Sequence, residues 1–396
     1  MNRTGTDKSC IRVCLFAPAF PPVVGGIEVF LGTLAYQLAI RNVVVHIVAG
    51  TELEPSLIRI LEKSGGSSTW VKRNPPPGSV VWEYDTFYRA EALYNALSIN
   101  PVDIIHAASH DTALSAVIAR EALGQIPIIT AFGEIATESN NPFGQSRSSF
   151  IHSLDQIDAY LAWSKFYEEL AYKYNLPRHK VHRILPGVEV DRFSKGSRNK
   201  GRKMLSLTDD VFILCCPSRF TPRKGQLELV KAVASLPIDR DKFRVIMTGS
   251  INSGSKEYMD EVLYEIKKAN LEKIFIIKLE TPFAELPHLM AAADIVVQPS
   301  HLEGLGGAAL EAMATNTCTL LTNTRGFDEI AIHNVNSWIV EPKSPESLAE
   351  GILALMRDPA LRKRLSQKAS TYVHNNFRAN HVADRILALY KKIAWN

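Results

Sequence analysis

The sequence predicts an α/β protein with two domains in tandem, each built on an open parallel sheet with helices between its strands. Short apolar runs alternate with amphipathic stretches from one end of the chain to the other, which is typical of βαβ units. The composition, 46% hydrophobic and 22% charged, is that of an ordinary globular protein. A length of 396 residues favours two hydrophobic cores, because a single core stops growing beyond roughly 250–300 residues.

Six short apolar runs in each half are expected to form the strands. In the first half they lie at 11–16, 43–48, 104–106, 126–130, 159–163 and 182–185. In the second half they lie at 211–216, 243–248, 274–277, 295–298, 319–322 and 338–340. Helical periodicity between the runs predicts helices, notably at 27–39, 111–123, 226–234, 258–269, 307–314 and 345–356.

A polar, basic stretch without periodicity separates the two halves. Residues 191–203 read DRFSKGSRNKGRK, which is typical of a solvated interdomain linker. The expected organisation is an N-terminal domain at 1–190, a linker at 191–208, a second domain at 209–375 and a closing segment at 376–396. The amphipathic run 382–393 is expected to be a helix that packs back across the domain boundary.

Charge and composition exclude several classes of protein. A net charge of +4, from 45 basic and 41 acidic residues, is too balanced for a nucleic-acid-binding protein but is compatible with anionic ligands or weak contact with an anionic membrane surface. No apolar run approaches the ~20 residues of a membrane span, and the N-terminal MNRTGTDKSC is too polar for a signal peptide. Five cysteines without ligand spacing predict buried thiols. We therefore expect a cytoplasmic protein, with any membrane contact peripheral and at the inner face.

The most informative stretch is 298–311, QPSHLEGLGGAALE. Glu303 lies in a loop after an expected strand, three glycines follow, and Glu311 lies about one turn into the next helix. Glycines at such a turn let a ligand approach backbone N–H groups, and the helix N-terminus favours an anion. A carboxylate in the helix can accept hydrogen bonds from the vicinal hydroxyls of a ribose. On these residues alone, a purely structural explanation is as good as a ligand site. In that explanation one glutamate caps the helix and the other is an ordinary surface acid.

A second signal is PSRFTPRKG at 217–225, directly after an expected strand. Arg219 offers a planar fork of donors and Lys224 a compact charge, which together would suit a diphosphate. The alternative, two solvated surface cations, is the commoner outcome for such a pair taken alone.

Two further loops follow strands and carry glycines. In PPVVGGIE, 21–28, a bare Gly-Gly turn precedes a helix. Gly249 opens a stretch close to a nucleotide-binding P-loop, but the lysine, Lys256, lies one residue beyond the required spacing, which argues against an ATPase. The acidic pair Asp239 and Asp241 falls at the wrong end of the sheet for a ligand site, so no metal site is expected.

Together these motifs resemble the retaining GT-B glycosyltransferases of glycosyltransferase family four. PSHLEGLGGAALEAMAT matches the family's Glu-x7-Glu signature, and PSRFTPRKG matches Gly-Arg-Leu-x3-Lys-Gly in spacing, with Ser218 and Phe220 replacing the Gly and the Leu. The resemblance spans roughly residues 11–390 and implies two Rossmann-like domains that face across a cleft. It implies a hexosyltransferase that moves a sugar from a nucleotide diphosphate, with UDP expected, to an acceptor hydroxyl with retention, and with neither a metal nor a cofactor.

The resemblance also assigns roles to residues. Arg219 and Lys224 would stabilise the departing diphosphate, Glu303 would lie near the transferred sugar or its diphosphate, and Glu311 would bind the donor ribose. The other donor-binding positions that it implies are Gly25, Gly26, Gly249, Gly304, Leu305, Gly306 and Gly307. The acceptor is expected at N-domain loops, including the irregular segments 51–88 and 134–147, which identify neither the acceptor nor the oligomeric state.

The chain departs from the family beside the expected sugar site. Where the family carries the histidine of Thr-x-His-Gly, this chain has Phe132. A phenyl ring cannot hydrogen-bond a sugar hydroxyl, although it can pack against a pyranose face. His110, Glu134 or the substrate itself is expected to supply the missing polar contact, and His106 is interpreted as a core or strand-end histidine.

Two other functions remain open. A non-catalytic subunit that binds a nucleotide sugar or a partner would fit the loss of the family histidine. An epimerase of the same fold would require additional acid/base residues, which the sequence does not show. The expected diphosphate cations and both glutamates are present, and this favours the transferase, because a binding subunit has no need of cations that stabilise a transition state.

Overall fold

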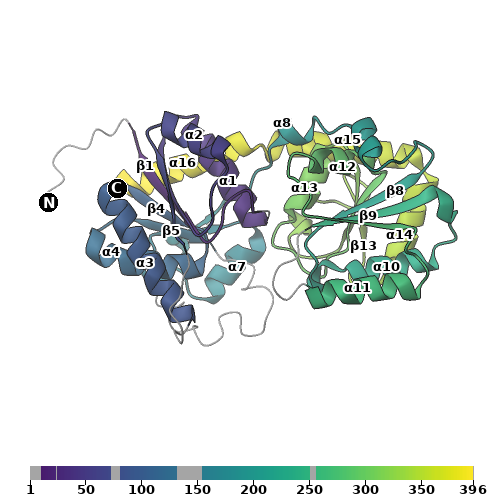
Figure 1. Cartoon of the computed structure of the whole chain (residues 1–396), viewed down its shortest axis with the longest axis horizontal. Coiled ribbons are helices and arrows are strands. Elements are labelled where there is room, and N and C mark those ends of the chain that lie inside the picture. The colour runs from purple at the N-terminus through teal and green to yellow at the C-terminus, as the bar shows by residue number, and fades with distance from the viewer. Residues whose placement is uncertain (1–9, 24, 73–80, 132–153, 250–255, 396) are drawn as a thin grey trace. The chain divides into compact units, whose positions relative to one another are not determined.

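The computed structural model describes residues 10–395 except 24, 73–80, 132–153 and 250–255, with the backbone alone at 81–84 and 111. The chain forms two compact units (Figure 1). Unit 1 combines Met1–Gly187 with Ala379–Asn396, and unit 2 is the continuous stretch Val188–Arg378.

Unit 1 contains a parallel sheet of seven strands in the order β3-β2-β1-β4-β5-β6-β7. The strands are β1 (Arg12–Ala17), β2 (Val44–Ala49), β3 (Ser67–Trp70), β4 (Ile104–Ala107), β5 (Ile128–Ala131), β6 (Ala159–Ala162) and β7 (Val181–Arg183). The helices are α1 (Gly26–Ala39), α2 (Pro55–Lys63), α3 (Val81–Ile99), α4 (His110–Leu123), α7 (Lys165–Lys173) and α16 (Ala379–Trp395). The elements α2 and β3 and the start of α3 lie within 51–88, where the sequence analysis expects irregular chain.

Helices cover both faces of this sheet (Figure 1). Along β1, Val13 and Leu15 pack into the core formed with α1, α2 and α16, whereas Cys14 and Phe16 pack into the core formed with α3, α4 and α7. Successive strand residues point to opposite faces. Because both faces are buried, the strands read as continuous apolar runs rather than as alternating ones.

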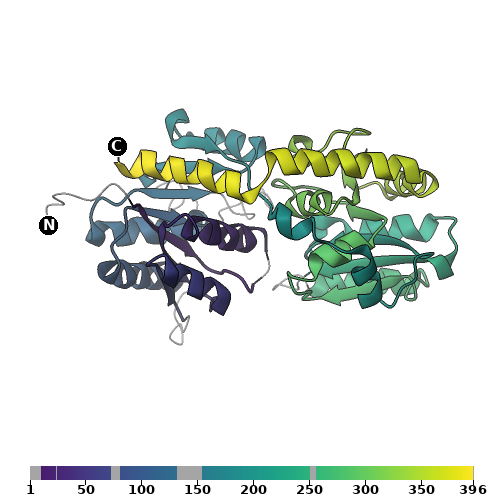
Figure 2. The same ribbon diagram turned by 90° about the horizontal axis from the view of Figure 1, so that it is seen from above.

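The last helix, α16, belongs to unit 1 although it follows unit 2 in the sequence. Figure 2 shows it, in yellow, lying along the strands and helices of that unit. The Tyr390 hydroxyl lies 2.5 Å from Nδ1 of His106 on β4, and both side chains are fully buried. Burial lowers the pKa of His106 to about 4, so the ring is neutral at pH 7. His106 is therefore a core histidine.

Unit 2 contains a parallel sheet of six strands in the order β10-β9-β8-β11-β12-β13. The strands are β8 (Phe212–Pro217), β9 (Phe243–Gly249), β10 (Phe275–Leu279), β11 (Ile295–Gln298), β12 (Cys318–Thr322) and β13 (Trp338–Val340). The helices are α8 (Val190–Phe193), α9 (Arg198–Met204), α10 (Gln226–Ser235), α11 (Lys256–Lys268), α12 (Leu286–Ala292), α13 (Gly307–Ala314), α14 (Pro345–Arg357) and α15 (Pro359–Asn376). Figure 1 shows α10, α11 and α14 on one face of the sheet and α12, α13 and α15 on the other.

The segment 191–208 differs from the solvated linker that its composition suggests. It contains most of α8 and all of α9, and it belongs to unit 2. Ser197 caps α9 by accepting a hydrogen bond from the Lys200 N–H, and α9 packs against α12. At Gly201 a Cβ would lie 2.0 Å from the carbonyl oxygen of His288, which shows how closely the two helices approach.

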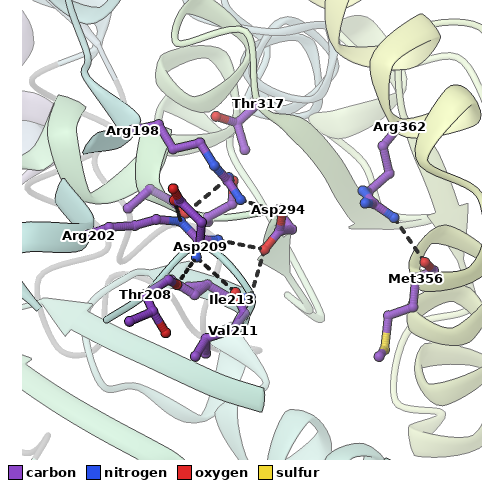
Figure 3. Close-up of polar contacts among 12 residues, drawn as sticks. Arg198, Arg202, Thr208, Asp209, Val211, Ile213, Asp294, Thr317, Met356 and Arg362 are labelled. Carbon is purple, nitrogen blue, oxygen red and sulfur yellow. Dashed lines mark hydrogen bonds and ion pairs between the residues drawn. The ribbon is translucent and has the colours of Figure 1, made fainter. Parts of the chain in front are cut away.

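Two arginines of α9 are bound by one acid, Asp294, in a group that we call the Asp294 cluster (Figure 3). Arg198 Nη2 and Arg202 Nη2 lie 2.9 and 3.1 Å from its two carboxylate oxygens. Arg202, only 2% exposed, also donates to the carbonyl oxygens of Thr208 and Val211. The acid is 92 residues from Arg202 in the sequence, so local composition cannot reveal that the basic segment is anchored.

Candidate functional site

The order of strands in unit 2 creates a topological switch point between β8 and β11. From β8 the sheet continues to β9 and β10 on one side, and from β11 it continues to β12 and β13 on the other. Open α/β sheets bind ligands beyond the carboxyl ends of their strands at such a point. The loops that follow β8 and β11 carry the sequence-predicted motifs 217–225 and 298–311.

Between these two loops lies a buried ion-pair group, the Glu303 cluster, formed by Arg223, Lys224, Ser300 and Glu303. Glu303 Oε1 accepts hydrogen bonds from Lys224 Nζ at 2.6 Å and from Ser300 Oγ at 2.6 Å. Arg223 Nη1 lies 3.9 Å from Glu303 Oε2. The side chains of Lys224 and Glu303 are 13% and 5% exposed. The structure thus brings two of the predicted catalytic residues into direct contact.

Arg223 belongs to this cluster but is absent from the sequence-predicted site residues. Its Nη1 lies 3.5 Å from the carbonyl oxygen of Leu302, and its own carbonyl oxygen accepts from the His301 N–H at 2.7 Å. The only signal in the sequence was its position beside Lys224 in TPRKG. A family pattern that leaves this position unspecified gives it no weight.

The third predicted catalytic residue, Arg219, lies half-buried in the loop after β8. Gln226, 1% exposed, donates from Nε2 to the Arg219 carbonyl oxygen at 2.8 Å and to Ser218 Oγ at 3.0 Å. Ser218 stands where the family has a glycine. Its hydroxyl group is thus bound by Gln226, the first residue of α10.

Gly249 and Gly306 have steric reasons to be glycine. A Cβ at Gly249, the last residue of β9, would lie 2.1 Å from the carbonyl oxygen of Ser218. Gly306 caps α13 with φ +90°, and a Cβ there would lie 2.3 Å from the Phe327 ring. Gly307, the first residue of α13, is exposed with open space where a Cβ would be. Of these three glycines, Gly307 alone has no packing reason to be glycine.

The other predicted positions of the loop after β11 are Gly304 and Leu305. Gly304 is half-buried, and the Leu305 side chain is buried. At Leu305, therefore, the backbone is better placed than the side chain to meet a ligand.

Glu311 lies on α13 close to Glu189, the N-cap of α8, and to Arg192 within α8, two residues that the sequence motifs do not include. Helix α8 packs against α13, and Arg192 Nη1 lies 2.8 Å from Glu189 Oε2. Burial and, to a smaller extent, the negative charge of Glu189 raise the pKa of Glu311 to about 8, although the charge of Arg192 opposes both effects. The carboxyl is therefore largely protonated at neutral pH in the unliganded protein.

Unit 1 has a switch point of its own, between β1 and β4. Gly25 and Gly26 follow β1 at the start of α1, and His110, half-buried, is the first residue of α4 after β4. The Glu28 carboxylate occupies the space beside Gly25, since a Cβ there would lie 2.1 Å from Oε2. Phe132 and Glu134 lie outside the described residues, directly after β5.

Among the described residues, no group of three or more His, Cys, Asp or Glu side chains is arranged to hold a metal ion. Asp239 and Asp241 are exposed in a turn that leads into the amino end of β9. Of the five cysteines, only Cys10 is exposed. Within the same described ranges no helix is both long and apolar enough to cross a membrane.

The chemistry that the loops of unit 2 offer is the binding of a polyanion. Three basic residues, Arg219, Arg223 and Lys224, lie in the loop after β8, and two of them contact Glu303 of the loop after β11. Cations held in partly buried, pre-organised positions act more strongly on an anion than solvated ones do. Glu311, on the adjoining helix, offers an acceptor for hydroxyl groups.

Comparison with known proteins shows the family of the chain. The sequence family described as Glycosyltransferase Family 4 matches residues 24–192, and the family described as Glycosyl transferases group 1 matches residues 197–372. An uncharacterized glycosyltransferase of Methanocaldococcus jannaschii is 24% identical over 397 residues, covering 96% of this chain and 98% of that protein. A D-inositol 3-phosphate glycosyltransferase of Actinosynnema mirum is 23% identical over 389 residues, covering 92% of each protein.

Solved structures show the same fold and confirm the predicted fold class of two Rossmann-like α/β units. HepE of Anabaena, crystallised in complex with UDP and glucose, has a TM-score of 0.82 and 20% identity, covering 96% of this chain and 100% of that one. Sucrose-phosphate synthase from Thermosynechococcus elongatus has a TM-score of 0.80 and 19% identity, covering 96% and 98%. With one family matched in each half, the chain belongs to the GT-B glycosyltransferases, as a member of the Glycosyltransferase Family 4 and Glycosyl transferases group 1 families.

Proposed function

We propose that this protein transfers a hexosyl group from a UDP-sugar to an acceptor hydroxyl, with retention of anomeric configuration and without a metal ion. The observation that carries the proposal is the Glu303 cluster at the switch point of unit 2, with Arg219 in the adjacent loop and Glu311 on the helix that follows. HepE, which shares the fold, has been crystallised with UDP and with UDP-glucose, and this supports UDP as the nucleotide.

The proposed donor matches the electrostatics of the site. A UDP-sugar carries two negative charges on its diphosphate, and a further charge develops there as the sugar departs. Arg219 and Lys224 would stabilise this charge, an effect worth ~2.7–4 kcal/mol for a single well-placed donor in other enzymes. Because these side chains supply the positive charge, the proposed reaction needs no divalent cation.

Retention requires the acceptor to attack on the face that the diphosphate leaves. In the proposed step the bond between the anomeric carbon and the diphosphate oxygen breaks, and the acceptor oxygen bonds to the same face of the sugar. The acceptor proton passes to the departing diphosphate. Glu303 would hold Lys224 in place for this step, and Glu311 would accept hydrogen bonds from the ribose hydroxyls.

We propose that the acceptor binds to unit 1. Gly25, Gly26 and His110 lie at the switch point of that unit, where an acceptor or the sugar would be bound. We propose a hydroxylated acceptor, either a saccharide or a polyhydroxylated small molecule. His110 is a described side chain there that can hydrogen-bond a hydroxyl and also move a proton.

The test begins with donor selection. Thermal unfolding is measured with UDP-, GDP- and ADP-glucose, since a ligand at 100 times its Kd stabilises the folded state by ~2.7 kcal/mol. The UDP-sugar is expected to give the largest shift. Transfer to a panel of hydroxylated acceptors in the presence of EDTA, followed by NMR assignment of the anomeric configuration, tests the reaction. Loss of activity in EDTA or an inverted product would contradict the mechanism.

A second candidate function is a non-catalytic subunit that binds a nucleotide sugar, which Phe132 favours because it replaces the family's polar side chain. The two functions differ in one measurement. A UDP-sugar that binds tightly but is neither hydrolysed nor transferred, with any acceptor of the panel, would favour the binding subunit. Turnover that disappears in Arg219→Ala and Lys224→Ala would favour the transferase.

A further inference from the structure

The loop that carries Glu303 is fixed at a second point, two residues before the glutamate. His301 Nε2 lies 3.1 Å from Glu228 Oε1, and the two side chains are 20% and 19% exposed. The backbone N–H of the same histidine donates to the carbonyl oxygen of Arg223 at 2.7 Å. His301 therefore connects the loop after β11 to helix α10. It also connects this loop to the turn after β8 that carries Arg223 and Lys224, which we call the basic turn.

Glu228 lies in the first turn of α10, directly after the basic turn. Burial, the largest single effect, raises the pKa of the Glu228 carboxyl, but the contact with His301, a backbone hydrogen bond and the charge of Lys231 together outweigh burial and lower the pKa. The carboxylate is thus a charged partner for His301 at neutral pH. A second acid so close in sequence to Arg223 and Lys224 would weaken their positive field if nothing else engaged it.

The remaining contacts show why this one matters. The loop of residues 299–306 spans the distance between β11 and α13. It is held at its start by Gln298 Nε2, which donates to the Pro217 carbonyl oxygen at 2.9 Å, and by Thr322 Oγ1, which donates to the Ser300 carbonyl oxygen at 2.5 Å. Beyond Ser300, contacts made by His301, Leu302 and Glu303 join this loop to the basic turn and to α10.

We propose that His301 and Glu228 form a positioning pair, which holds the Glu303 loop against the Arg223–Lys224 turn in the geometry that accepts the diphosphate. Neither residue touches the donor. The pair acts by fixing the position of the two loops relative to each other. It also binds the carboxylate of Glu228 to His301, so that this carboxylate does not pair with Arg223 or Lys224. This inference rests on the proposed function, because it concerns the geometry of the same donor site.

The test is a double-mutant cycle read out by isothermal titration with UDP. His301→Ala and Glu228→Ala are each expected to weaken UDP binding about five- to tenfold, and the double variant is expected to be no weaker than the worse single variant, because residues in contact are coupled. The KM for UDP-glucose should rise by a similar factor while kcat changes less than about threefold. His301→Gln, whose amide N–H can still reach Glu228, should restore binding to within about threefold of the wild type.

Controls separate position from stability. Glu265→Ala removes the acid of the exposed Lys268–Glu265 pair on α11, whose atoms lie 3.2 Å apart, and should leave UDP binding unchanged. Single variants that bind UDP as tightly as the wild type would overturn the positioning pair, and so would effects that multiply in the double variant. If His301→Ala does not fold, Glu228→Ala and His301→Gln carry the same comparison. A wild-type protein that binds no UDP would instead overturn the proposed function.

Discussion

Unit 2 contains two carboxylates, one partly buried and one buried, that each face two basic side chains, at opposite ends of β11. Asp294 directly precedes the strand and contacts Arg198 and Arg202. Glu303 follows the strand and contacts Arg223 and Lys224. The two clusters match in charge, although Arg198 is 41% exposed whereas Arg223 and Lys224 are 12% and 13% exposed.

They differ in where their remaining hydrogen bonds go. Asp294 also accepts from the backbone N–H of Ile213 at 2.8 Å, and Arg202 donates to two backbone carbonyl oxygens. The partners of the Glu303 carboxylate described above are all side chains. These side chains lie on loops beyond the carboxyl ends of the strands. An ion-pair group bound to the main chain at the amino end of a sheet thus maintains the fold. One held between loops at the carboxyl end is instead free to meet a ligand.

The largest expected effect comes from breaking the Asp294 cluster. Arg202→Ala leaves the Asp294 carboxylate and two carbonyl oxygens without their buried partner, which costs about 3–5 kcal/mol. At roughly 2–4 °C per kcal/mol for a unit of this size, calorimetry should show the melting temperature of unit 2 falling by about 6–20 °C. Arg240→Ala, at an exposed arginine, is the control. An equal loss in both variants would refute the structural role, and the folded Arg202→Ala protein should still bind UDP.

Breaking the Glu303 cluster should have the opposite profile. Lys224→Ala is expected to lower kcat for UDP-glucose by about 10²–10³-fold, the usual loss for one donor to a developing negative charge. Its melting temperature should fall less than that of Arg202→Ala, because Arg223 and Ser300 remain beside Glu303. Lys268→Ala, on the exposed face of α11, is the matched control. Activity within twofold of the wild type in Lys224→Ala would assign this cluster, too, to the fold.

A third effect separates Glu311 from both clusters through pH. Its pKa is raised from an ordinary value of 4.5 to about 8, mainly by burial, so the folded state binds the proton more tightly than the unfolded state does. Folding stability is therefore lost as the pH rises from about 4.5 to about 8. Glu311→Gln removes this loss and should gain roughly 1–3 kcal/mol over the wild type between pH 5 and pH 8.5.

The same variant tests the role of Glu311 in binding. Because the ionised carboxylate is the better acceptor for ribose hydroxyls, wild-type affinity for UDP-glucose should rise by up to about tenfold from pH 6 to pH 8.5. Glu311→Gln should bind more weakly with no such rise. If the melting temperatures of the wild type and Glu311→Gln change with pH in the same way across this range, the pKa of Glu311 is not raised.

The smallest expected effect is at Gly307. Alanine fits there without contact and favours the helix by up to ~1 kcal/mol, so Gly307→Ala should melt at the same temperature or slightly higher. If a diphosphate approaches the backbone at this turn, UDP binding should nevertheless weaken about three- to tenfold. Gly306→Ala, with φ +90° and a contact with Phe327, should destabilise the protein with or without UDP. Unchanged UDP binding in Gly307→Ala would place the ligand elsewhere.

Most of the sheet could be predicted from the sequence because buried parallel strands are continuous apolar runs. β3 could not, since its residues are the polar SSTW at the edge of the sheet. α9 could not either, because its arginines are charged residues whose partner, Asp294, is distant in the sequence. Propensity and periodicity are local, whereas what orders these two segments is tertiary contact.

The candidate site divides in the same way. Glu303, Lys224 and Arg219 could be named because each lies in a loop after a strand and matches a motif. Arg223, His301 and Glu228 could not be selected, since only their distances in the folded chain distinguish them from other charged residues. The same holds for Glu189 and Arg192 beside Glu311, which α8 brings to α13 from more than a hundred residues away.

The discontinuity of unit 1 has a consequence for synthesis on the ribosome. Its core includes Val382, Ile386 and Tyr390 from α16, and these emerge only after all of unit 2, about 190 residues, has been translated. At ~5–20 residues per second the apolar surface that α16 covers stays open for roughly 10–40 s. Unit 2, continuous from Val188 to Arg378, needs no such wait. The nascent amino-terminal half therefore has to keep this apolar surface from aggregating until α16 is synthesised.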